Sequence, residues 1–214
     1  VSTNYEIKVE KLGKLKVTKA KLPENPDDPD DPGDNRFQAT VPKDVVYNGK
    51  DQKQAINVTD TKTGKELTSG ENGDVTITYS DDVKNVGTVA VTIVANENGN
   101  YSGSFTRTYK ITPAQITVKA VDKTKVYGDA DPELTVEITS GQLYGDDEIK
   151  YDISREAGEN VGKYTIELKD GTNFILKALR LTKGNYDVTF ENGTFTITPA
   201  PLTITTPSAT RRTA

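Results

Sequence analysis

The chain has 214 residues with 27 basic and 32 acidic side chains, a net charge of −5, and no cysteine, histidine, methionine or tryptophan. Without histidine and cysteine it can assemble neither a Ser-His-Asp nor a Cys-His nucleophile, and it lacks the usual zinc ligands and any disulfide. Six of the acidic residues lie between positions 23 and 35, so the rest of the chain, at about +1, has no field to gather nucleic acid.

The first segment, residues 1–22, contains "NYEIKVEKLGKLKVTKA" and is basic. Its apolar residues alternate with polar ones, which predicts a strand pair, and we interpret it as the C-terminal strands of a preceding repeat. An isolated hairpin is marginal in water. We therefore expect this pair to dock on a sheet edge of this chain or of a neighbouring copy through Ile7, Val9, Leu15 and Val17.

The second segment, residues 23–35, reads "PENPDDPDDPGDN" and has no apolar residue. Each proline favours an extended predecessor and the aspartates repel one another, so the segment is predicted to be a linker. Its oxygens lack the alternating ligand spacing and the distal glutamate of an EF-hand, so we expect no dedicated metal site.

Residues 36–113 and 114–200 are predicted to be two β-sandwich modules. Val75, Ile77 and Tyr79 alternate with threonine, as do Ile116 and Val118 with polar residues, which is typical of half-buried strands. Asn-Gly and Asp-Gly pairs between these runs predict tight hairpins. No stretch has helical periodicity, so the fold class is all-β, with two tandem immunoglobulin-like sandwiches.

An internal repeat sets the size of one module. "NYSGSFTRTYKITPA" begins at residue 100 and "NYDVTFENGTFTITPA" at residue 185, 85 residues apart, and a related segment begins at residue 4. The distance from residue 4 to residue 100 is 96, or 83 without the 13-residue acidic segment. A unit of about 84 residues fits a small sandwich. Residues 201–214 are interpreted as the start of a following repeat.

Residues 114–200 carry a set of motifs in a fixed order: "VYGDADPELT", "SGQLYGDDEI", "REAGENVGKYTI", "NYDVTF" and "GTFTITPA". Together they resemble the MBG family, immunoglobulin-like repeats that occur in tandem in large bacterial surface proteins. Residues 36–113 are similar to a related class of surface-protein repeat through "VYNGK" and "VTITYSDDVKNVGTVAVTI". The resemblance implies a secreted protein of the bacterial cell surface whose partners include adjacent repeats of the same chain.

We interpret the shared motifs as structural. Tyr47, Tyr127 and Tyr186 each stand beside a turn residue, where a ring can close the sandwich while its hydroxyl reaches backbone or water. Adjacent acids such as Asp146 and Asp147 are interpreted as solvated turn charges rather than as the paired carboxylates of a glycosidase. The chain is therefore predicted not to be an enzyme and to use no cofactor.

Similarity to stalk domains of Gram-positive bacteria implies one covalent possibility, an isopeptide bond between the first and last strands. The candidates are Lys119 and Asn185, with Glu137 or Asp152 as the assisting acid. The bond would expel one ammonia, so an intact mass measurement tests it.

Two functions remain open at this point. The first is a non-catalytic stalk and adhesion segment that spaces and presents binding regions. The second is that the modules themselves bind a host extracellular protein, such as an immunoglobulin or a mucin-like ligand. The apolar segment around Phe174 and Leu176 is the candidate binding surface for that second function, with a bulged core hairpin as the alternative interpretation.

Overall fold

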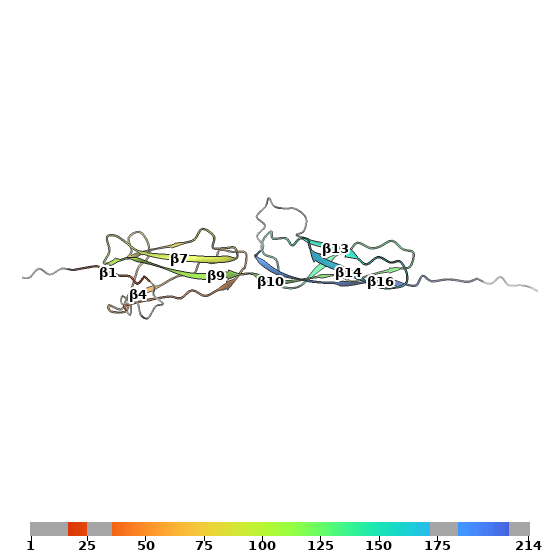
Figure 1. The fold of residues 1–214 in the computed structure, drawn as a ribbon, viewed down its shortest axis with the longest axis horizontal. Helices are drawn as coiled ribbons and strands as arrows, with labels where there is room; N and C mark the ends of the chain where they lie inside the picture. Colours follow the sequence, from red (N-terminus) through yellow and green to blue (C-terminus); the bar gives the residue numbers. More distant parts are fainter. Residues whose placement is uncertain (1–16, 25–35, 172–183, 206–214) are drawn as a thin grey trace, which may run out of the picture. The chain divides into compact units, whose positions relative to one another are not determined.

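The computed structural model describes residues 17–24, 36–171 and 184–205, and the elements in these ranges are β-strands (Figure 1). The all-β prediction is confirmed. Within the described residues there is no helix long and apolar enough to cross a membrane.

The chain divides into two compact units. Unit 1 comprises residues 1–45, 51–83 and 87–111, and unit 2 comprises residues 46–50, 84–86 and 112–214. Two short turns that come early in the sequence therefore belong to unit 2. They contribute side chains to the site described below.

Unit 1 consists of short strands in three sheets, ordered β3-β9-β7-β6, β2-β4-β5 and β1-β8. The strands are β1 (Ala20–Lys21), β2 (Phe37–Ala39), β3 (Val45–Val46), β4 (Val58–Asp60), β5 (Lys65–Glu66), β6 (Val75–Tyr79), β7 (Gly87–Ala95), β8 (Tyr101–Ser102) and β9 (Ser104–Thr112). The longest pairing is the antiparallel one between β7 and β9, which runs from Gly87 opposite Ile111 to Val94 opposite Ser104.

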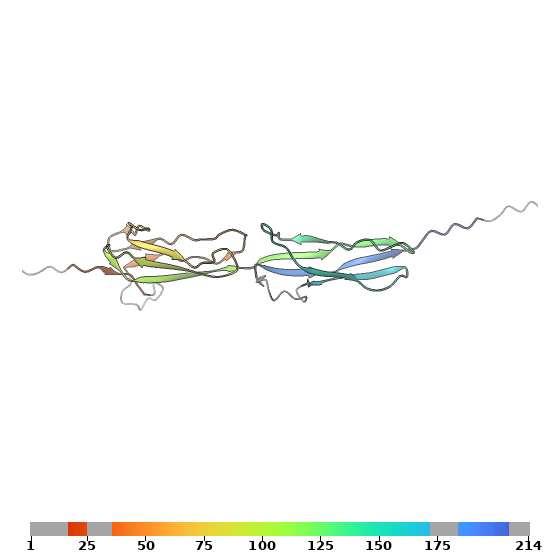
Figure 2. The same cartoon turned by 90° about the horizontal axis from the view of Figure 1, so that it is seen from above.

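Unit 2 has two sheets, ordered β11-β16-β14-β13 and β12-β10-β15. Its strands are β10 (Ala114–Ala120), β11 (Lys123–Val126), β12 (Val136–Ser140), β13 (Tyr151–Arg155), β14 (Gly162–Asp170), β15 (Tyr186–Glu191) and β16 (Gly193–Thr198). Two pairings are parallel, β10 with β15 and β11 with β16. The strands of unit 2 run nearly alongside one another in both views (Figures 1 and 2).

Alternating burial explains why these segments form strands. In β9, β10 and β16 every second residue is buried, because successive side chains of a strand point to opposite faces. In unit 2 the inward residues meet as one cluster, made of Val118, Ala120, Ile166, Leu168, Phe195 and Ile197. The period-two pattern of the sequence is therefore the packing pattern of the core.

The first strand of unit 1 lies before residue 22, where the sequence analysis placed a boundary. Ala20 donates its N–H to the carbonyl of Asn100 at 2.9 Å, and Leu22 donates to Ser102 at 2.7 Å. Leu22 is fully buried. Ala114 makes the equivalent bond to Asn185 in unit 2 at 2.9 Å. The boundary expected after residue 22 thus does not separate two units, because β1 (Ala20–Lys21) already pairs with β8 of unit 1.

The acidic segment consequently has a different place in the chain from the one expected. Residues before it, at Ala20–Lys21, and after it, at Phe37–Ala39, both form strands of unit 1. It follows the first strand of a unit rather than a completed preceding repeat. This is why removing its 13 residues restores the repeat length.

Candidate functional site

Three tyrosine rings pack together in unit 2 and form what we call the tyrosine cluster, Tyr47, Tyr144 and Tyr186. Tyr144 and Tyr186 are stacked, with ring centroids 6.4 Å apart. The Tyr47 ring meets both edge-on, at 5.8 Å from Tyr144 and 5.4 Å from Tyr186. Edge-to-face contacts at this distance are favourable beyond the area that they bury. The cluster therefore fastens the Tyr47 turn to strand β15 and the loop before β13.

One carboxylate satisfies two hydroxyls of the cluster. Asp147 Oδ2 accepts from the Tyr47 hydroxyl at 2.8 Å and from the Tyr186 hydroxyl at 2.7 Å. Burial, followed by the hydrogen bond to Asp147, raises the pKa of Tyr47 to about 12 and raises that of Tyr186 as well. Both hydroxyls are therefore protonated donors at neutral pH. Asp147 is not the solvated turn charge that the sequence suggested.

An asparagine and a glycine complete the contact. The Asn185 side chain accepts from the Val86 N–H at 3.0 Å and donates to the Asn85 side-chain oxygen at 2.9 Å. Gly49 has a φ of +74°, and a Cβ atom there would lie 2.6 Å from the Tyr144 Cβ atom. Glycine is therefore required at position 49 for two reasons: the backbone is left-handed, and a side chain would push the Tyr47 turn away from the loop that carries Tyr144.

The hydrogen bonds of this cluster join segments that are distant in the sequence. The hydroxyls of Tyr47 and Tyr186 are held protonated, and Asp147 accepts a hydrogen bond from each of them. Among the described residues there is no group of three or more carboxylate, histidine or cysteine ligands that could hold a metal ion.

A second polar cluster explains two of the sequence motifs. Lys125 is buried and donates to Asp131 at 2.7 Å and to Glu159, while Arg155 pairs with the same two carboxylates. The Arg155 guanidinium also lies 4.8 Å over the Phe195 ring. Hydrogen bonds from Arg155 and then Lys125 lower the pKa of Asp131 to about 2. "YGDADPE" and "REAGEN" therefore supply the two halves of one ion-pair network.

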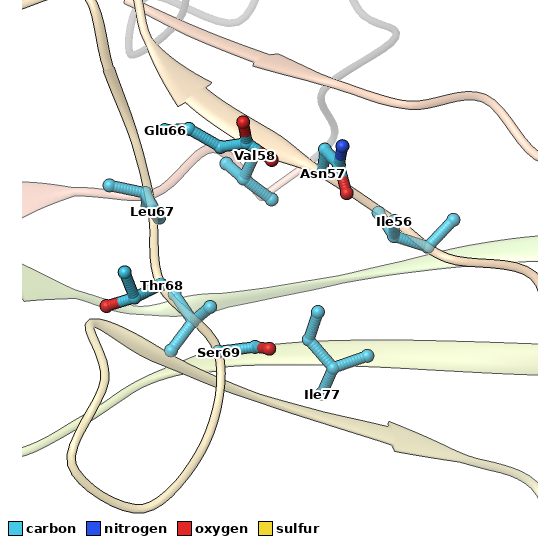
Figure 3. Close-up of a pocket in the computed structure, with 9 residues that line it drawn as sticks. Ile56, Asn57, Val58, Glu66, Leu67, Thr68, Ser69 and Ile77 are labelled. Carbon is cyan, nitrogen blue, oxygen red and sulfur yellow. The ribbon is translucent and has the colours of Figure 1, made fainter.

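Unit 1 has an open groove of about 450 Å³ between its two larger sheets (Figure 3). Buried apolar side chains form its floor and polar ones stand at its rim. The lining residues are Ile56, Asn57, Val58, Glu66, Leu67, Thr68, Ser69, Val75 and Ile77. The groove lies beside β5 and β6, the outer strands of their sheets, and Ser69 at its rim forms a parallel bridge to Val75 at the start of β6.

The structure does not bring the isopeptide candidates together. Lys119 lies opposite Glu191 at one end of the β10–β15 pairing, whereas Asn185 precedes the other end, where Ala114 lies opposite Tyr186. The two positions are six residues apart along the strands, which is roughly 20 Å of extended chain. Glu137 on β12 does lie opposite Lys119 on β10, but Asp152 on β13 lies opposite Lys169 on β14. With its side chain bonded to Asn85 and Val86, Asn185 has a fastening role.

The other predicted contact residues are placed as follows. Phe174 and Leu176 lie outside the described residues, as do Ile7, Val9 and Leu15. Val17 is described and is exposed, and the docking residue of this segment is Leu22 instead. Sequence reasoning missed the partnership of Tyr47 with Asp147. Its only signal was that a tyrosine begins each "YNGK"-type turn.

Residues 116–196 match the family model of the MBG domain (YGX type). The match covers unit 2 from β10 to β16, including both halves of the Lys125 network. Among curated proteins, none matches the chain.

Proposed function

Because residues 116–196 form an MBG-type domain, a repeat of bacterial surface proteins, we propose that the chain is a non-catalytic stalk and adhesion segment on the bacterial cell surface. Repeated sandwiches in series suit a spacer, since each adds length without chemistry. The observation that supports this most is the recurrence of one strand order. The sheet β3-β9-β7-β6 of unit 1 has the same arrangement as β11-β16-β14-β13 of unit 2.

The parallel pairings of unit 2 suit a chain that is loaded from its ends. β10 pairs with β15 over six residues, and β11 pairs with β16 over four. Pulling the first strand one way and the last strand the other slides parallel neighbours past each other. Their evenly spaced hydrogen bonds then share the load instead of breaking in turn. A stalk needs this resistance.

Single-molecule pulling tests the proposal. The chain contains no cysteine, so handles can be attached at single introduced cysteines. We expect unit 2 to unfold at a force at least about twofold higher when pulled through the chain ends than when pulled through cysteines at Val121 and Glu191. Those positions adjoin the same end of two neighbouring strands, so the second geometry peels bonds one at a time.

The contour length released on unfolding identifies unit 2 in both geometries, and the two-cysteine variant held without load controls for stability. Equal unfolding forces in the two directions would contradict a load-bearing role.

The groove of unit 1 favours the second candidate function, binding of a host extracellular protein. A concave surface with apolar side chains and a few polar groups is the usual form of a binding site. We expect Ile77→Arg to abolish capture of such a protein from host secretions, while the exposed Val94→Arg on the neighbouring strand β7 leaves capture unchanged. If both variants capture equally, the groove is not the binding surface.

A further inference from the structure

Unit 2 contains two copies of one turn, and only one of them is covered. Tyr47 donates its N–H to the carbonyl of Thr112, and Tyr127 donates its N–H to the carbonyl of Thr198, both at 2.8 Å. Each threonine is followed by Pro-Ala in the sequence. Tyr47 is 2% exposed because it packs against the other two rings of the tyrosine cluster, whereas Tyr127 is 53% exposed.

A second turn is duplicated in the same way. Gly87 lies opposite Ile111 and Gly162 lies opposite Ile197, and in each case the preceding residues are Asn-Val. Val86 is half-buried and donates its N–H to the Asn185 side chain, whereas Val161 is 52% exposed. Since Gly162 and Tyr127 both adjoin the end of β16, Val161 and Tyr127 flank the same end of one sheet.

The chain that leaves this end has the sequence of a first strand. "APLTIT" at residues 200–205 repeats the pattern of "AQITVK" at residues 114–119. Ile116 and Val118 are buried in unit 2, whereas Leu202 is 84% exposed and Ile204 is 78% exposed. Within the described part of the chain, residues 201–205 belong to no strand. Leu202 and Ile204 thus stand at the sequence positions of core residues in a first strand, but both are exposed.

Proline at position 201 is compatible with this role. In unit 1 the N–H groups of Ala20 and Leu22 bond to the neighbouring parallel strand, and because successive N–H groups of a strand point to opposite sides, that of Lys21 points away from this neighbour. Position 201 corresponds to Lys21. A proline there removes an N–H that the pairing does not use, which is the situation in which strands tolerate proline.

We propose that Tyr127, Val161 and residues 200–205 form a docking surface for a further unit of the same repeat type. The inference rests on the stalk function and specifies how units join. The incoming unit supplies an Asn-Tyr strand that pairs in parallel with residues 200–205. It also supplies a loop equivalent to residues 144–147, whose carboxylate accepts the exposed Tyr127 hydroxyl as Asp147 accepts that of Tyr47.

The test extends the full chain after Thr205 with a second copy of residues 120–199, so that residues 200–205 are the segment available to the copy as its first strand. Amide hydrogen exchange at Leu202 and Ile204 is measured with and without the extension. We expect exchange at both amides to slow by about 100-fold in the extended chain, because they become core-strand hydrogen bonds.

Side-chain variants then test the covering contacts. Tyr127→Ala in the extended chain should reduce the protection of Leu202 about tenfold through the lost ring contacts. The matched control is Tyr151→Ala, an exposed tyrosine at the opposite end of the same sheet, where it lies opposite Asp170. The control should leave that protection unchanged.

Two results would overturn the proposal: unchanged exchange at Leu202 and Ile204, or equal effects of the two tyrosine variants. An extension that stays unfolded also counts against it, provided that a copy bringing its own residues 114–119 folds at the same position. Pulling on the unextended chain is unaffected by any of these outcomes, so a failure here is distinguishable from a failure of the stalk function.

Discussion

Replacing Asp147 by alanine should destabilise unit 2 by about 2–3 kcal/mol. The carboxylate accepts two tyrosine hydroxyls, at 2.7 and 2.8 Å, and no change in backbone geometry is needed to remove it. A hydrogen bond to a charged group contributes about 1.5–3 kcal/mol, and a buried donor that loses its acceptor costs about 1–3 kcal/mol. Asp147 is half-buried, so water replaces part of the loss and the lower part of the combined range applies.

Two variants separate the hydrogen bonds from the packing. Asp147→Asn keeps an acceptor oxygen in place and should cost about 1 kcal/mol, since only the charge is lost. Tyr47→Phe keeps the ring contacts and removes one donor. Combined with Asp147→Ala it should show a coupling energy of about 1 kcal/mol, because the two changes remove the same bond.

Amide hydrogen exchange measures these differences within the intact chain. Ile166 lies in the core of unit 2 and Val91 in the core of unit 1, so the first reports the perturbation and the second serves as the internal control. Asp147→Ala should accelerate exchange at Ile166 by a factor of about 30–150, which is the same free energy expressed as a rate. An unchanged rate at Ile166, or an equal cost for Asp147→Asn, would refute the reasoning.

Two further predictions concern other parts of unit 2. The pKa of Asp131 is lowered to about 2 from the ordinary 3.8. Its contribution to stability is therefore fully present above about pH 4 and is lost as the pH falls towards 2. Acid unfolding followed by circular dichroism should show a smaller pH dependence of stability in Asp131→Asn than in the unaltered chain. Gly49→Ala should destabilise the tyrosine cluster by about 1–3 kcal/mol, because φ is positive there and the new Cβ would lie 2.6 Å from Tyr144. Gly64 also has a positive φ but has open space around it, so Gly64→Ala should lower stability less in thermal unfolding.

Strand positions could be predicted because their cause is local. The alternation of Ile116 and Val118 with polar residues requires one buried face, and a strand is the element with that period. The Asn-Tyr repeat likewise located β8 and β15, whose first residues are Tyr101 and Tyr186. Turn glycines such as Gly49 were predictable for the same reason, since positive φ has few other occupants.

The candidate site could not be predicted because its cause is distant. Tyr47 and Asp147 are separated by 100 positions, and nothing near either residue indicates the other. Adjacent acids in a polar loop look the same whether they face water or two tyrosine hydroxyls. The interpretation of Asp147 as solvated and the pairing of Lys119 with Asn185 share this weakness, because both needed the register of strands that meet only on folding.

Sequence alone therefore determined the fold class, the repeat length and the absence of histidine and cysteine chemistry, all of which depend on composition or on spacing along the chain. Tertiary structure decided that residues 20–22 belong to unit 1, that Tyr47 is covered and that its counterpart Tyr127 is exposed. The physical reason is that the burial of a side chain depends on which surface packs against it and not on its residue type alone. Two turns with nearly the same sequence differ here only in whether another surface lies against them.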